Sequence, residues 1–310
     1  MVWRLLLILG DVALLLGLIA LLRAVNGGVE RAGTQLAVFC LAVLNPVLIL
    51  SGCAIPEDKQ FQTALMLYAA SLMLSPVASS VRRALWSGVV FSLSIFFKLF
   101  GVFLLPLWLA RVRQEGWRFA LWNGLGGLVP AAASLAAFGP YFVGTLAARG
   151  VQNSIRGPEH ASPWVLFPLG GEPYVIAKIL VVGGFCALLL GLLAKRRIDV
   201  LNFCAGIGVA FACLWLDKGA INRMNIAIVF AVAALASLSR AWFGYFAVGL
   251  ACLSAVAYAV GLGVLRVHPD SVDSLLVLLF VLAYLAVLVR LAIAKPEHAG
   301  RSSPSVPIRA

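Results

Sequence analysis

The chain has 310 residues, of which 63% are hydrophobic and only 12% are charged, and its mean hydropathy is +1.03. The apolar residues come in repeated runs of about 20, the length that a helix needs to cross a bilayer, which excludes a soluble globular fold. The net charge of +12 would point to nucleic acid in a soluble chain. Here most basic residues lie in short stretches between apolar runs, where they set topology and contact anionic lipid, so we expect no nucleic-acid partner.

The apolar runs predict an all-α, polytopic helical membrane protein with about nine full spans and one re-entrant or short helix pair. The first run, Leu5 to Val25, is long for a signal peptide and lacks a small-residue cleavage site, so we expect a retained span. The full spans are expected at 3–25, 33–54, 61–79, 118–138, 174–194, 198–216, 220–239, 241–264 and 272–294. Residues 1–294 would form a single integral membrane domain with an outer loop at 139–173, followed by a disordered cytoplasmic tail at 295–310.

The apolar run from Ala84 to Ala110 is interrupted by Lys98 and later by Pro106. A lysine at the centre of a membrane helix costs roughly 2.5–3.5 kcal/mol on insertion scales, so its presence needs an explanation. Either one long span buries a functional cation, or two short helices at 84–97 and 99–111 meet in a turn at Lys98.

The distribution of basic residues favours the two short helices. Only that arrangement places Arg82 and Arg83 on the same face as Arg111 and the basic cluster at 195–197, as the positive-inside rule requires. Helices of this length reach only about 20 Å, against a hydrocarbon core of about 30 Å, so we expect a half-depth pair. Lys98 would lie at the outer face of the cytoplasmic membrane, with the N-terminus outside and the C-terminus in the cytoplasm.

This topology gathers polar residues at the outer face. The candidates are Glu57 and Asp58 before the 61–79 span, Lys98, His160 in the long loop, and Arg223 with Asn225 at the start of the 220–239 span. Such carboxylates and cations suit group transfer from a lipid phosphate: the carboxylate accepts the proton of an attacking hydroxyl, and a cation stabilises the departing phosphate. The alternatives are a solvated loop for the two acids and a snorkelling side chain for Lys98.

Asp11 lies about two turns inside the first expected span. Acids inside membranes usually pair or function, although Asp11 could also pair with Arg4 or accept a hydrogen bond from a neighbouring helix. The three histidines are spread over loops and tail, and the six cysteines show no paired spacing. The sequence therefore supports neither a metal site nor a nucleotide cofactor.

Three stretches resemble the GT-C superfamily of membrane glycosyltransferases, in particular its mannosyltransferase-like branch that uses polyprenyl-phosphate sugars. The stretch from Leu44 to Ala70 resembles the family's Asn-Pro motif and the polar turn that opens the next helix. The stretch from Arg82 to Val112 is similar to a family segment with a lysine and a later proline, here Lys98 and Pro106. The stretch from Asp217 to Leu235 is similar to a family helix that opens with a basic residue and an asparagine.

The resemblance implies a transferase that takes its sugar from a polyprenyl-phosphate donor in the membrane. It implies that Lys98 and Arg223 contact the donor phosphate, with Glu57 or Asp58 as the catalytic acid. The opening span with Asp11 looks like the family's second membrane helix. The family's first helix and acidic outer loop then have no counterpart here, so we expect a truncated relative or a chain that works with a membrane partner subunit.

Two other functions are compatible with the same residues. A lipid-glycan transporter or flippase component would use the outer cations to bind headgroups without chemistry, and it would need a polar path that reaches both faces. A non-catalytic subunit would complete another membrane protein, which the missing first helix would explain.

Overall fold

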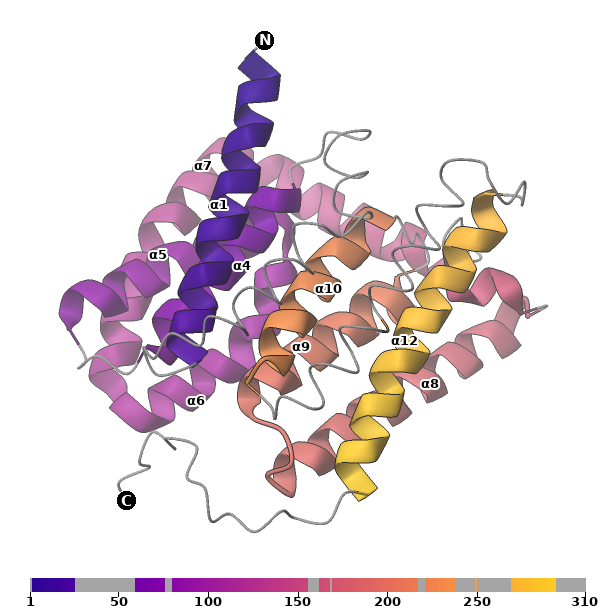
Figure 1. Cartoon of the computed structure of the whole chain (residues 1–310). Coiled ribbons are helices and arrows are strands. Elements are labelled where there is room, and N and C mark those ends of the chain that lie inside the picture. Colours follow the sequence, from indigo (N-terminus) through magenta and orange to yellow (C-terminus); the bar gives the residue numbers. More distant parts are fainter. Residues whose placement is uncertain are drawn as a thin grey trace.

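The structure is a computed structural model that describes residues 2–25, 59–75, 80–155, 162–167, 169–216, 221–237, 249 and 269–293. This part of the chain is all-α, as the sequence predicts (Figure 1). Its α-helices are α1 (Val2–Val25), α4 (Lys59–Leu74), α5 (Val81–Lys98), α6 (Leu105–Glu115), α7 (Trp117–Ile155), α8 (Gly171–Ala194), α9 (Val200–Val209), α10 (Ile221–Leu235) and α12 (Pro269–Ile293). Two 3-10 segments, η1 (Phe100–Leu104) and η2 (Pro163–Leu166), and the π-helical segment η3 (Ala210–Trp215) complete it.

Four helices in the described part are long and apolar enough to cross a membrane. They contain the stretches Ile8–Val25, Trp117–Gly139, Gly171–Ala194 and Ser274–Ile293. Exposed aliphatic side chains on two of them, such as Val129 at 71% and Leu180 at 68%, suit contact with lipid. The chain is therefore an integral multi-pass membrane protein by the length and composition of these helices.

The prediction of about nine full spans is wrong for the described residues. Helices α4 and α10 have only 16 and 15 residues, fewer than the roughly 20 that a full span needs. α4 ends at Leu74, two residues before Pro76, because the residue before a proline is driven out of the helical conformation. The expected spans at 33–54 and 241–264 lie outside the described residues.

The break at Lys98 is confirmed, but both arms are longer than predicted. α5 begins at Val81 because Ser80 caps it, its side chain accepting a hydrogen bond from the Arg83 backbone at 3.2 Å. With 18 residues, α5 is about 27 Å long. The other arm, η1 followed by α6, reaches a similar length at about 2.0 and 1.5 Å per residue. Both arms are thus longer than the roughly 20 Å expected, although neither is among the four helices of the described part that are long and apolar enough to cross a membrane.

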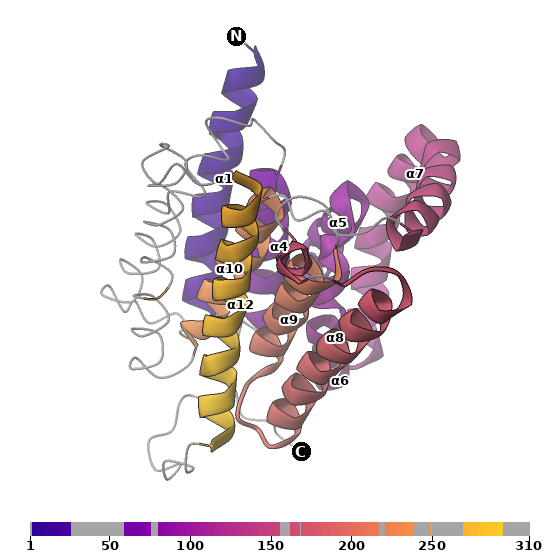
Figure 2. The same cartoon turned by 90° about the vertical axis from the view of Figure 1, so that its right-hand side faces the viewer.

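Part of the stretch expected as an outer loop at 139–173 is helical. α7 continues from Trp117 to Ile155 as one helix of 39 residues, so the first half of that stretch is helical. Its first 23 residues, Trp117–Gly139, alone cover about 35 Å at 1.5 Å per residue, which is enough to cross the hydrocarbon. Figure 2 shows the far end of α7 reaching away from the other helices.

The helices pack as two groups, α1 with α4 to α7 and α8 with α9, α10 and α12, which meet where α4 contacts α10 and where η1 and α6 contact α9. α1 lies along α4, with the Gly17 backbone against Ala64 and Leu67, and the first turns of α1 project beyond the other helices (Figures 1 and 2). α5 packs on α7, and α10 packs on both α4 and α9. The core they share is aliphatic, with α10 buried along its second half.

The contacts define two ends of the bundle. At one end the guanidinium groups of Arg83 and Arg111 both donate to the carbonyl oxygen of Ser75, at 3.5 and 3.2 Å, which we call the basic end. Arg111 also forms an ion pair with Glu115. The opposite end carries Leu99, between α5 and η1, and we call it the turn end.

Candidate functional site

The turn end is built around a sharp change of direction directly after Lys98. Leu99 adopts a left-handed conformation with φ 61°, and its backbone N–H donates to the carbonyl oxygen of Ile95 at 2.7 Å. The Val102 N–H then donates to the Leu99 carbonyl oxygen at 3.1 Å, which starts η1. A left-handed leucine costs roughly 1–2 kcal/mol, so the surrounding packing must hold this turn in place.

Gly101 allows η1 to fold back onto the last turns of α5. A Cβ added at Gly101 would overlap the side chain of Ser94 and lie 2.8 Å from the Ile95 nitrogen. Ser94 is fully buried there, and its hydroxyl donates to the Phe91 carbonyl oxygen at 2.7 Å. Only glycine permits this approach of the two backbones, so the residue type at 101 fixes the path of the chain after Lys98.

Two buried glutamines at the start of α4 lie beside this turn. Gln62 is fully buried, and its Nε2 donates to the Ser94 carbonyl oxygen at 2.9 Å. Gln60 is 8% exposed, and the Oε1 atoms of both glutamines have no hydrogen-bond partner among the described residues. The start of α4 and the end of α5 therefore meet at the turn end, with polar atoms held in an otherwise apolar environment.

Aromatic rings connect the turn to α9. The ring centroids of Phe100 and Phe103 in η1 lie 6.5 and 5.2 Å from that of Phe211 in η3. η3 is a π-helical continuation of α9, a form that occurs mostly as short segments and frequently at functional sites. The Trp164 indole N–H donates to the Leu214 carbonyl oxygen at 2.7 Å and so attaches η2 to the same end.

A second lysine lies at the turn end, one that sequence reasoning missed. Lys178 is only 8% exposed, and its Nζ lies 5.0 Å from the ring centroid of Trp215 and 5.4 Å from that of Tyr174. Cation–π contacts of this kind gain strength where water is excluded. The sequence alone could have indicated Lys178 as a candidate, because it is a single charge in an apolar run, as Lys98 is.

Three of the predicted site residues, Lys98, Arg223 and Asn225, lie at the turn end. Lys98 is the last residue of α5, and Arg223 and Asn225 lie in the first two turns of α10. α10 runs antiparallel to α9, since Asn202 Nδ2 at the start of α9 donates to Ser237 Oγ beyond the end of α10 at 2.8 Å. The first turns of α10 therefore lie at the turn end with the Lys98 backbone.

The remaining predicted site residues are Asp11, Glu57, Asp58 and His160. Asp11 lies at the level of Gln60, because the Gly10 backbone packs on the Gln60 side chain, but the Asp11 side chain is exposed on α1. Glu57, Asp58 and His160 lie outside the described residues. Among the residues described, no group of three or more His, Cys, Asp or Glu side chains is arranged to hold a metal ion.

The fold thus defines an all-α, multi-pass membrane protein with a polar and aromatic cluster at one end of its helices. No known protein family, curated protein or solved structure matches the chain.

Proposed function

We propose that the protein is a membrane glycosyltransferase of the GT-C type, or a truncated relative, that transfers a sugar from a polyprenyl-phosphate donor. One observation carries the proposal: α5 ends at Lys98, in a turn beside the start of α4 and at the same end as the first turns of α10. Lys98 and Arg223, which are 125 positions apart in the numbering, thereby come to one end of the bundle. Glu57 and Asp58 directly precede α4 in the sequence.

The proposed reaction exchanges one bond at the anomeric carbon of the sugar. An acceptor hydroxyl attacks this carbon, its proton passes to the carboxylate of Glu57 or Asp58, and the bond from the carbon to the phosphate oxygen breaks. The polyprenyl phosphate leaves with additional negative charge. Lys98 and Arg223 stabilise that charge, which develops in the transition state and is therefore a productive target for fixed cations.

The sidedness follows from the charges. The basic end, with Arg83 and Arg111, would face the cytoplasm, and the turn end would face outward. A polyprenyl-phosphate sugar presented at the outer leaflet would then reach Lys98 from the bilayer. Cysteine-accessibility labelling of a Lys98→Cys variant in intact cells tests this orientation, and labelling only after permeabilisation would reverse it.

The function is tested by measuring transfer of radiolabelled mannose from polyprenyl-phosphate mannose to endogenous acceptors in membranes. Lys98→Met is expected to reduce transfer by about 100-fold or more. Removal of one group that stabilises developing charge in an enzyme typically has an effect of this size. Lys195→Met is the control, because Lys195 is exposed directly after α8. A Lys98→Met protein that inserts normally and transfers mannose at the wild-type rate would remove Lys98 from the site.

The same assay is repeated with polyprenyl-phosphate glucose as donor. A wild-type protein that transfers neither sugar when expressed alone, but binds both donors, would overturn the enzymatic proposal. It would favour the non-catalytic membrane subunit instead.

A further inference from the structure

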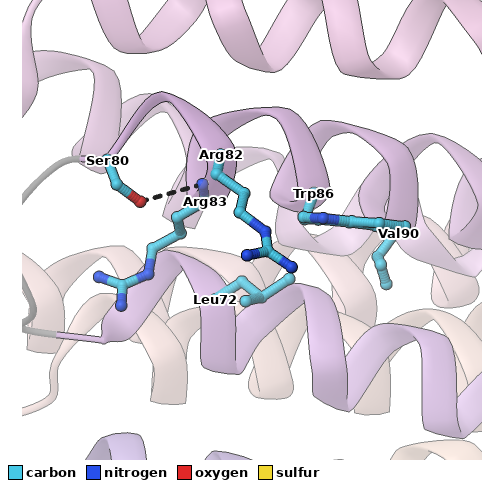
Figure 3. Close-up of a pocket in the computed structure, with 6 residues that line it drawn as sticks. All are labelled: Leu72, Ser80, Arg82, Arg83, Trp86 and Val90. Atoms are coloured by element: carbon cyan, nitrogen blue, oxygen red, sulfur yellow. Dashed lines mark hydrogen bonds between the residues drawn. The ribbon is translucent and has the colours of Figure 1, made fainter.

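A pocket lies at the basic end of the bundle, opposite the turn end. It has a volume of about 320 Å³ and lies between the end of α4 and the start of α5 (Figure 3). Its lining residues are Leu72, Ser80, Arg82, Arg83, Trp86 and Val90. Two of these six carry positive charge and none is acidic, so the pocket attracts an anion.

The two arginines are held differently. The Arg83 guanidinium is tied to the Ser75 carbonyl oxygen at 3.5 Å, and its backbone N–H is bonded to the Ser80 hydroxyl. Arg82 extends from α5 toward Leu72 of α4 (Figure 3). Within the described part of the chain, no hydrogen bond or ion pair occupies the Arg82 guanidinium. A planar guanidinium presents several donors in a fixed geometry and is well suited to two oxygens of a phosphate.

An apolar stripe leads from the pocket along α5. Trp86, Val90, Leu93 and Phe97 follow one another at spacings of four, three and four residues, which places them on one face of the helix. Trp86 is 54% exposed and Phe97 is 45% exposed, so this face is open to the surroundings of the bundle. The order along the helix is arginine, then tryptophan, then aliphatic and aromatic side chains, which matches the order of headgroup, interface and hydrocarbon in a bilayer.

We infer that this pocket binds the headgroup of an anionic phospholipid. The phosphate lies on Arg82 and Arg83, and an acyl chain follows the stripe from Trp86 toward Phe97. The volume supports this division, because about 320 Å³ is at the lower end of small-molecule pockets and accommodates a headgroup but not two chains. The inference is independent of the proposed transferase, whose residues lie at the other end of the helices.

The test uses the full chain purified in a neutral detergent and native mass spectrometry with equal amounts of phosphatidylglycerol and phosphatidylcholine that carry the same chains. The wild-type protein is expected to retain phosphatidylglycerol preferentially. Arg82→Gln should reduce that retention by about fivefold, the effect of one basic side chain near an anionic headgroup. Arg118→Gln is the matched control, since Arg118 is exposed near the start of α7 and does not line the pocket.

Two further arms separate the alternatives. Trp86→Ser keeps both guanidinium groups and removes the first apolar contact of the chain, so it should also reduce phosphatidylglycerol retention while leaving the melting temperature near that of wild type. Glycerol 3-phosphate, which has the headgroup phosphate but no acyl chain, should compete poorly. Effective competition by it would show a site for soluble phosphate and overturn the lipid assignment.

The inference would equally be overturned if phosphatidylcholine were retained as well as phosphatidylglycerol. It would also be overturned if Arg118→Gln lowered retention as much as Arg82→Gln, because the attraction would then belong to the whole basic end.

Discussion

Gln62 and Ser94 are 32 positions apart, yet the Gln62 side-chain amide donates a buried hydrogen bond to the Ser94 carbonyl oxygen at 2.9 Å. The contact joins the first turn of α4 to the last turn of α5, where the chain is about to reverse at Leu99. It is therefore one of the interactions that hold Lys98 at the turn end.

Replacing Gln62 by leucine should weaken the fold. The substitution removes the hydrogen bond to the Ser94 carbonyl, and a buried bond of this kind contributes about 1 kcal/mol to the free energy of unfolding. Gln60→Leu is the matched control: the Oε1 atoms of both glutamines have no partner among the described residues, so both variants remove an unpaired oxygen and only Gln62→Leu also removes the bond to Ser94. Denaturant titration in mixed micelles measures both variants, and equal destabilisation would contradict the role given to Gln62.

The contact between α5 and α7 depends on which glycine faces the neighbouring helix. A Cβ added at Gly126 would overlap the Leu85 carbonyl oxygen, whereas one added at Gly124 would meet nothing within 4 Å. Gly126→Ala should therefore lower the free energy of unfolding by about 1–3 kcal/mol, because the helices must separate. Gly124→Ala should instead stabilise by up to about 1 kcal/mol through helix propensity.

Thermal unfolding of the two alanine variants in the same detergent compares them directly. The prediction is a difference in sign between positions 124 and 126. Two variants that melt at the same temperature would mean that α7 is rotated relative to α5.

Asn123 in α7 forms hydrogen bonds to α5 and α6. We expect its contribution to the free energy of unfolding to be coupled to that of Trp108. It is 3% exposed, its Oδ1 accepts a hydrogen bond from the Trp108 indole N–H at 2.8 Å, and its Nδ2 donates to the Ala84 carbonyl oxygen at 3.3 Å. Asn123→Leu leaves the indole N–H without this partner and should cost about 1–3 kcal/mol.

A double-mutant cycle with Trp108→Phe tests the pairing. Once the phenylalanine has removed the indole donor, Asn123→Leu should cost less than it does in the wild-type protein. The expected interaction energy is about 0.5–3 kcal/mol, and strictly additive effects would exclude a direct coupling.

Trp164 should stabilise the π-helical end of α9. Its indole N–H donates to the Leu214 carbonyl oxygen, which lies in the last turn of η3. Trp164→Phe keeps the aromatic ring and removes only the donor, so it should lower the free energy of unfolding by about 1–3 kcal/mol. Trp117→Phe is the control, since Trp117 is 69% exposed and receives the same substitution. Hydrogen exchange at residues 210–215 reports where the structure has loosened.

The class of fold and the break at Lys98 could be predicted from the sequence, because both follow from the positions of apolar and charged residues along the chain. An apolar run with one charge, flanked by arginines that must share a face, leaves few arrangements. The extension of α7 to Ile155 was missed because Pro140 and several polar residues follow Gly139, which is typical of a loop. The residues after Gly139 show no regular spacing of apolar side chains that would indicate a helix.

The site could be predicted only in part, for reasons of packing. Gly124 and Gly126 look alike in the sequence, and the rotation of α7 against α5 decides which of them makes contact. Gln62 and Lys178 were missed because their partners, Ser94 and Trp215, are distant in the chain. Single polar residues in apolar runs show that an interaction is needed, but not which residue supplies it.

The hairpin of α5, η1 and α6 also bears on how the chain enters a bilayer during synthesis. Arg83 and Arg111, near its two open ends, share the Ser75 carbonyl oxygen, so both ends lie on one side of the bundle. Inserted as a unit from that side, the hairpin carries a single charged side chain, that of Lys98, across the hydrocarbon. A single long span over the same residues would have to move one of the two arginine groups through the membrane, at a far greater energetic barrier.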